Sequence, residues 1–145
     1  MATVHVDWVN GMTFIATDST NHSVVISTTD AGVGMKPSEL LLAALAGCTA
    51  VDVVSILQKK RAKITDLRIT VNADQPRTEG YPRPFANFRL HYAVTGVNLK
   101  AEDVKRAIEL SEEKYCMVAA TLRQENTVSV DFEIIDAGLC EETTE

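Results

Sequence analysis

Two cysteines and one aspartate stand out among the residues of this sequence that could carry out chemistry. Cys48 lies in the middle of the apolar run LLLAALAGCTAVDVVSIL, residues 40–57, and Asp52 follows it four residues later. On an α-helix that spacing puts the two side chains on one face. Cys116 lies in KYCMVAATL, which is also rich in small residues. The residues alone leave two interpretations open: a redox-active thiol pair, or two small core residues.

The other residues with catalytic or ligand-binding potential form no pattern. His5, His22 and His91 occur singly, and the carboxylates are spread over helix surfaces and the tail. A stretch with two glycines, residues 32–34, lacks the spacing and the lysine of a phosphate-binding loop. Cys140 stands in an acidic tail where no helix would position it, so we interpret it as incidental. We therefore expect no bound metal ion and no organic cofactor.

The segments that must position the cysteines predict an α+β fold with the order βββ-α-ββ-αα-β. Short alternating runs predict three strands within the first thirty residues. Pro37 suits the first turn of a helix that we expect to end near residue 62. A strand pair, two helical pieces and a closing strand follow, over about residues 66–74, 87–96, 98–115, 116–124 and 127–135. Because the strands come in runs rather than in βαβ units, we expect antiparallel sheets in a single domain, residues 1–145.

Composition and charge limit the classes of partner. The chain has 145 residues, of which 46% are hydrophobic and 23% charged, as in a soluble globular protein. A net charge of −6 argues against nucleic acid, whose recognition needs concentrated lysine and arginine. Small and polar residues interrupt the apolar run, so we expect a buried central helix and no membrane association. An odd number of cysteines and no recognisable signal peptide predict a cytoplasmic location without structural disulfides.

Three segments share motifs with a known family. KPSELLLAALAGCTAVDVVSILQKKR opens with Pro-x-Glu-Leu and places Cys48 nine residues after the glutamate. YPRPFANFRLHYAVTG follows as a loop and a strand, and KYCMVAATLRQENTVSVDFEII contains a late Cys-x-Val-x-x-Thr-Leu motif. Together, over residues 20–136, these segments resemble the OsmC/Ohr family, which includes organic hydroperoxide resistance proteins. The predicted order of strands and helices agrees with the fold of that family.

This resemblance implies a thiol-dependent peroxidase, built as an intertwined homodimer in which a partner subunit covers the apolar helix. It implies that the Cys48 thiolate attacks the O–O bond of an organic hydroperoxide and becomes a sulfenic acid. Cys116 then forms a disulfide with it, and an external dithiol reductant restores both thiols. The alternative is a non-catalytic protein that binds a small apolar or acyl ligand at the dimer interface, or a redox sensor.

Two positions depart from the pattern of the family's peroxidases, which hold the reactive thiolate with an N-terminal arginine and a glutamate. The first arginine of this chain is Arg61, and Ser38 takes the place of the glutamate, with Glu39 one position later. The chain therefore resembles the OsmC-like branch of the family more closely. We expect Glu39 to support the site, and Arg83 or Arg77, in the loop between the paired strands, to supply the cation.

Asp52 needs a reason to lie beside Cys48, because a carboxylate close to a thiol disfavours the thiolate. We expect Asp52 to orient a cation or a hydroxyl group that in turn contacts Cys48. An interface or capping aspartate is the alternative.

Overall fold

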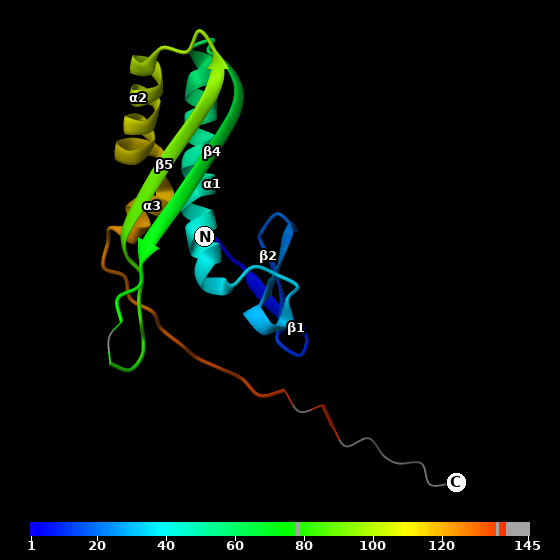
Figure 1. Cartoon of the computed structure of the whole chain (residues 1–145). Helices are drawn as coiled ribbons and strands as arrows, with labels where there is room; N and C mark the ends of the chain where they lie inside the picture. The colour runs from blue at the N-terminus through cyan, green and yellow to red at the C-terminus, as the bar shows by residue number, and fades with distance from the viewer. Residues whose placement is uncertain (78, 136, 139–145) are drawn as a thin grey trace.

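The computed structural model describes residues 1–77, 79–135 and 137–138, and it has the expected α+β architecture (Figure 1). Three N-terminal strands form an antiparallel sheet in the order β1-β2-β3, and two later strands form a second antiparallel sheet, β4-β5. The bounds of the elements are β1 His5–Asn10, β2 Thr13–Thr17, β3 Ser23–Ser27, η1 Thr29–Ala31, α1 Pro37–Lys59, β4 Lys63–Asp74, β5 Ala86–Val97, α2 Ala101–Leu110, η2 Ser111–Tyr115 and α3 Met117–Leu122. Here η1 is a 3-10 turn and η2 is a π-helical turn.

The N-terminal sheet depends on a tight turn and on one bridge to the segment before α1. Gly11 takes a left-handed φ of +48° between β1 and β2, a conformation that favours glycine. Ile26 of β3 forms a parallel bridge with Met35. Figure 1 shows this sheet beyond the N-terminal end of α1, away from the β4-β5 hairpin. Apolar side chains of the sheet, such as Trp8 and Val24, are exposed in the single chain.

Helix α1 is the centre of the packed part of the molecule. Pro37 begins it, as expected, because a proline in the first turn needs no backbone N–H. It ends at Lys59, slightly earlier than predicted, and Arg61 takes a left-handed φ of 59° as the chain turns into β4. Every fourth residue on one face of α1 is buried, namely Leu45, Thr49, Val53 and Leu57. This packed face lies against β4, α2, η2 and α3.

Two apolar clusters lie along the packed face. Towards the C-terminal end of α1, Val53 and Leu57 pack against α2 and are fully buried. Towards the N-terminal end, Leu45 packs with Cys116 and Ala119. Burial of a side chain as large as that of Leu57 contributes about 1.5–3 kcal/mol. Because Cys116 packs with Leu45 and Ala119, it belongs to the core and is held next to α1.

The opposite face of α1 is open in a single chain. Val51 is 70% exposed, and Leu41 is exposed as well. By length and composition α1 is apolar enough to cross a membrane, with a mean hydropathy of 2.2, and 22% of that stretch is buried. The core helix of a soluble protein can have the same length and composition, so this observation assigns no membrane, and the absence of one stays a prediction. The sequence predicts that α1 is buried as a central helix, but in the single chain it is buried on one side.

The predicted closing strand is wrong for the single chain. Residues 125–135 are described, and they form a segment without strand pairing that runs away from the body in Figure 1. Its alternating apolar side chains are exposed, with Val128 at 90%. Ladder hydrogen bonds need a neighbouring strand, and within the described part of the chain both sheets are made of other strands. Cys140 lies outside the described residues.

Candidate functional site

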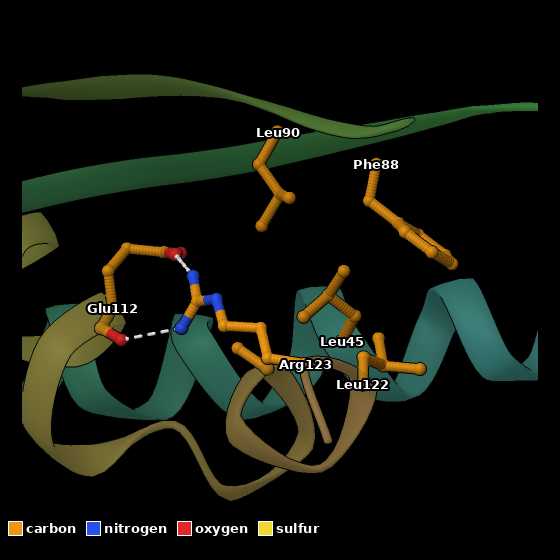
Figure 2. A pocket seen from close by; sticks show the side chains of 7 residues that line it. Leu45, Phe88, Leu90, Glu112, Leu122 and Arg123 are labelled. Atoms are coloured by element: carbon orange, nitrogen blue, oxygen red, sulfur yellow. Dashed lines mark hydrogen bonds and ion pairs between the residues drawn. The ribbon is translucent and has the colours of Figure 1, made fainter. Parts of the chain in front are cut away.

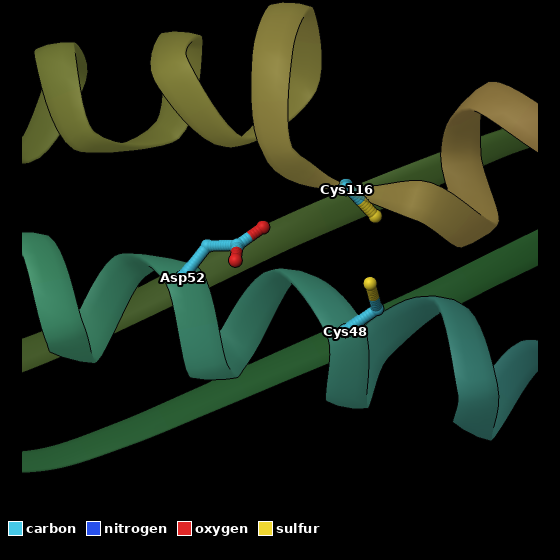
Figure 3. A group of neighbouring side chains, drawn as sticks. All are labelled: Cys48, Asp52 and Cys116. Carbon is cyan, nitrogen blue, oxygen red and sulfur yellow. The ribbon is translucent and has the colours of Figure 1, made fainter.

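Cys48, Asp52 and Cys116 come together where α1 passes the start of α3 (Figure 3). The two Sγ atoms and one carboxylate oxygen of Asp52 all lie within 4.8 Å of one another. Figure 3 shows the two sulfurs pointing toward each other, with Asp52 one helical turn further along α1. Both thiols are free. Because an S–S bond is about 2 Å long, the sulfurs need to approach by at most about 3 Å to form a disulfide.

The backbone around Cys116 fixes this thiol at the start of α3. Its N–H donates to the carbonyl oxygen of Ser111 at 2.8 Å, and its Sγ accepts from the Ala119 N–H at 3.4 Å. Cys116 is 3% exposed, whereas Cys48 is half-buried. Burial raises the pKa of the Cys116 thiol; the Ala119 N–H opposes this, and the neighbouring Cys48 and Asp52 raise it further. Cys116 therefore keeps its proton to a higher pH than a free cysteine does.

A chain of hydrogen bonds leads from Asp52 into the core. The Ser111 hydroxyl donates to Asp52 Oδ2 at 2.8 Å, and it also contacts the Thr49 hydroxyl at 2.9 Å. Thr49 in turn contacts the Tyr92 hydroxyl at 2.9 Å. Tyr92 donates to Glu112 Oε1 at 3.3 Å. Ser111 and Thr49 are fully buried. The hydroxyl that Asp52 orients is that of Ser111, and no cation takes this role among the described hydrogen bonds.

The hydrogen-bond chain from Asp52 to Glu112 has one more contact than it has hydroxyl protons. Four contacts link Asp52 to Glu112, and the three hydroxyl groups between them carry one proton each. Ser111 and Tyr92 use theirs on the two carboxylates, so Thr49 can donate to only one of its two neighbours. One of the two contacts of Thr49 therefore has no hydroxyl proton of its own.

A cavity of about 220 Å³ is lined on one side by Leu45 and Ala119, which pack against Cys116 and lie between it and the cavity (Figure 2). Five of its seven lining residues are apolar, Phe88 among them, but polar atoms make up more than half of the exposed wall. One end carries an ion pair in which Arg123 Nη2 lies 2.7 Å from Glu112 Oε2, and Arg123 Nη1 donates to the Glu112 carbonyl at 3.0 Å. The cavity therefore suits a small apolar molecule with one polar end.

The structure places Asp52 at the cysteines and the other three expected supporting residues away from them. Glu39 pairs with Lys36 at 2.9 Å in the exposed first turn of α1, about 14 Å along the helix axis from Cys48. Arg83 lines a hollow of about 450 Å³ beside the first turns of α1, with its guanidinium 4.9 Å from the centre of the Tyr81 ring. Arg77 is exposed in the loop between β4 and β5. Within this chain, none of the three comes next to the cysteines.

Arg123 and its partner Glu112 are the charged residues that sequence reasoning missed. Arg123 follows Cys116 by seven residues, and Ala119 lies between them at the third position. On a helix these spacings share one face, so the pattern was available in the sequence. The hydroxyl chain had no such signal, because Thr49, Tyr92 and Ser111 come from three separate elements.

Comparisons with known proteins identify the family of this chain. A family model described as OsmC-like protein matches residues 28–131. Protein YhfA of Escherichia coli (strain K12) is 38% identical over 132 residues, which cover 91% of this chain and 97% of YhfA. A crystal structure of a hypothetical protein from Aquifex aeolicus VF5 has a TM-score of 0.72 and 28% identity, and the match covers 85% of this chain and 87% of that one.

A likeness in fold extends to more distant proteins. The crystal structure of the organic hydroperoxide resistance protein OhrB of Bacillus subtilis has a TM-score of 0.54 at 18% identity, over 85% of this chain and 90% of that one. The match of the family model to most of the chain, the identity with YhfA and the common fold all point to one assignment: this chain belongs to the OsmC-like protein family.

Proposed function

We propose that this protein is a thiol-dependent peroxidase that reduces organic hydroperoxides, with Cys48 as the attacking thiol and Cys116 as the resolving thiol. The observation that carries the proposal is the pair of free thiols, brought within 4.8 Å of each other, with a cavity beyond Leu45 and Ala119. A protein of the same fold, OhrB, is named for organic hydroperoxide resistance. If the two cysteines served only to fill space in the core, their thiols would not need to face each other.

The different burial of the two thiols supports their roles. Cys48 is half-buried and Cys116 is 3% exposed, so Cys48 is the more accessible of the two residues. In the first step the Cys48 thiolate attacks one peroxide oxygen, the O–O bond breaks, and an alkoxide leaves and takes up a proton. In the second step Cys116 displaces hydroxide from the sulfenic acid, which gives a disulfide and water. An external dithiol then returns two electrons by thiol–disulfide exchange.

Asp52 takes part as a positioning residue. It lies within 4.8 Å of both sulfurs and accepts a hydrogen bond from the Ser111 hydroxyl, and the Ser111 carbonyl oxygen in turn accepts from the Cys116 N–H. Burial raises the pKa of Cys116 and the charge of Asp52 raises it further, so Asp52 favours the protonated form of the resolving thiol.

The proposal includes a homodimer as the active form, in the cytoplasm. Its support is the apolar surface that a single chain leaves open: the exposed face of α1 around Val51, the N-terminal sheet and the alternating segment 128–134. Soluble monomers rarely expose apolar surface on this scale. A second copy would cover α1 and offer the unpaired segment a strand to pair with.

The test is a single-turnover reaction in a Cys140→Ser background, which removes the third thiol. Reduced protein is mixed with one equivalent of cumene hydroperoxide, quenched within seconds and mapped by mass spectrometry. We expect a Cys48–Cys116 disulfide and one equivalent of alcohol. Cys116→Ser should stop at a Cys48 sulfenic acid, and Cys48→Ser should consume no peroxide. Equal peroxide consumption by Cys48→Ser and its parent would falsify the proposal.

A binding protein without catalysis is the second candidate, and the cavity with its Arg123–Glu112 ion pair favours it. This function would need the cavity but not the thiols. A ligand retained by the double variant Cys48→Ser, Cys116→Ser, together with no peroxide consumption by the parent, would support it.

A further inference from the structure

The same three side chains have a second chemical property, because they form a set of metal-ligand atoms. Two sulfurs and one carboxylate oxygen converge within 4.8 Å. A tetrahedral ion with Zn–S bonds of about 2.3 Å holds its two sulfurs about 3.8 Å apart. The two sulfurs therefore need to close by about 1 Å at most to reach that spacing.

Rigid elements hold the three donors in place. Cys48 and Asp52 are one turn apart on the 23-residue helix α1, the same i, i+4 spacing that places two ligands on one face of a metal-binding helix. Cys116 is fixed by backbone hydrogen bonds to Ser111 and from Ala119. Ser111 also donates to Asp52 Oδ2, and such a hydrogen bond orients a ligating carboxylate. A metal site with these ligands needs no rearrangement of the fold.

Charge favours a cation at this place. Two thiolates and a carboxylate this close together repel one another unless a positive ion lies between them. Two neighbouring cations are engaged elsewhere, since Arg123 pairs with Glu112 at 2.7 Å and Lys60 pairs with Asp103 at 3.1 Å. Lys59 lines the same hollow as Asp52. A divalent ion would balance the three donors directly.

An ion has a route to the site and a place for a fourth ligand. Asp52 lines a hollow of about 410 Å³, together with Ser55 and Tyr115. On the other side, Leu45 and Ala119 separate the sulfurs from the cavity of about 220 Å³. The ion can enter past Asp52, and water from the same hollow can complete a tetrahedral shell.

We propose that the reduced protein binds one thiophilic divalent cation per chain, of the Zn²⁺ type, through Cys48 Sγ, Cys116 Sγ and Asp52. Sulfur ligands select Zn²⁺ or Cd²⁺ over Mg²⁺ and Ca²⁺. Binding replaces the two thiol protons by two S–metal bonds and releases both protons to the solvent. Two-electron oxidation of the thiols by a hydroperoxide or another disulfide-forming oxidant removes both sulfur ligands and frees the ion. The site would thus hold metal only in the reduced state.

This inference does not rest on the proposed peroxidase activity. Metal binding needs the reduced thiols and no turnover, so protein that binds the ion but consumes no peroxide leaves the inference intact. Conversely, a peroxidase that binds no ion leaves the proposed function intact. The two failures are therefore distinguishable.

The experiment titrates Co²⁺ and then Zn²⁺ into reduced full-length protein in the Cys140→Ser background. We expect intense visible bands of tetrahedral Co²⁺, thiolate-to-metal charge-transfer absorption, saturation at about one ion per chain, and release of about two protons per ion. Zn²⁺ should displace Co²⁺, and Mg²⁺ should not. Cys48→Ser and Cys116→Ser should lose the charge-transfer absorption, and Asp52→Asn should weaken binding. Asp66→Asn, which removes an exposed carboxylate of β4, is the matched control and should bind normally.

Two further measurements keep the result interpretable. Ser111→Ala should lower Zn²⁺ affinity by about 10–100-fold, because Asp52 loses its orienting hydrogen bond. If a cysteine variant does not fold, reversible blocking of the thiols with methyl methanethiosulfonate in the folded parent tests the same ligands. Binding that survives this block, weak Co²⁺ bands without charge transfer, or no binding at all would each overturn the inference.

Discussion

Both faces of α1 carry apolar side chains, but their surroundings differ. On one face, Leu57 and Val53 are fully buried against α2 and the hairpin. On the other face, Val51 is 70% exposed, although it is the same type of residue as Val53 and only two positions away. Hydrophobicity therefore does not decide which residues a single chain buries; the elements that fold back onto the helix do. The chemistry follows the packed face, where Cys48 and Asp52 lie at its edge.

The largest effect expected on this comparison is a loss of stability from the packed face. Leu57→Ala should lower the free energy of unfolding by about 2–5 kcal/mol, because it leaves a cavity in the core. Val51→Ala should change it by less than about 0.5 kcal/mol in the monomer. Urea denaturation at several protein concentrations measures both. A Val51→Ala loss that grows with protein concentration would mean that a second copy covers the open face.

The second effect concerns the second copy that is proposed to cover the open face of α1. Val51→Asp puts a charge on the open face, and in the proposed homodimer an unpaired buried charge costs several kcal/mol. The dimer dissociation constant should rise at least about 100-fold, measured by sedimentation equilibrium. Val51→Thr keeps the shape of the side chain and should have a smaller effect. A wild-type protein that stays monomeric at all concentrations would contradict the expectation.

The third effect separates the polar chain from the apolar packing of the same face. Thr49→Val keeps the volume of the side chain but leaves Tyr92 and Ser111 without a shared partner. Loss of this buried contact should cost about 1–3 kcal/mol of unfolding free energy. Thr70→Val, on an exposed position of β4, is the matched control and should change stability by less than about 0.5 kcal/mol. Equal losses for the two variants would mean that the chain contributes nothing specific.

Much of the fold follows from local patterns in the sequence. The apolar run with Pro37 at its start predicts α1, and the alternating runs predict both antiparallel sheets. The closing strand fails for an instructive reason. Its alternation around Val128 is real, but a strand needs a neighbour, and alternation says nothing about whether that neighbour lies in the same chain.

The site was less accessible to sequence reasoning than the fold. That Cys48 and Cys116 meet followed from the family resemblance, because spacing alone cannot bring two helices together. Arg123 was missed although its spacing from Cys116 fits one helix face. Arg83 drew attention instead because it lies in a loop, but in this chain it lines a different hollow. Long-range contacts such as those of Thr49 leave no trace in a single sequence.

The smallest effect is a pH dependence that compares the buried thiol with a free one. Burial raises the pKa of Cys116, so above about pH 8.5 the unfolded chain loses this proton while the folded chain still holds it. The unfolded state then binds fewer protons, so stability falls as the pH rises from there through the raised pKa. In metal-free Cys140→Ser protein, the difference in unfolding free energy from Cys116→Ser should shrink over that range. Asp52→Asn removes a charge that raises this pKa, so it should move the change to lower pH. A difference that stays constant with pH would show that folding does not change the pKa of Cys116. The packed face would then have no electrostatic effect on this thiol.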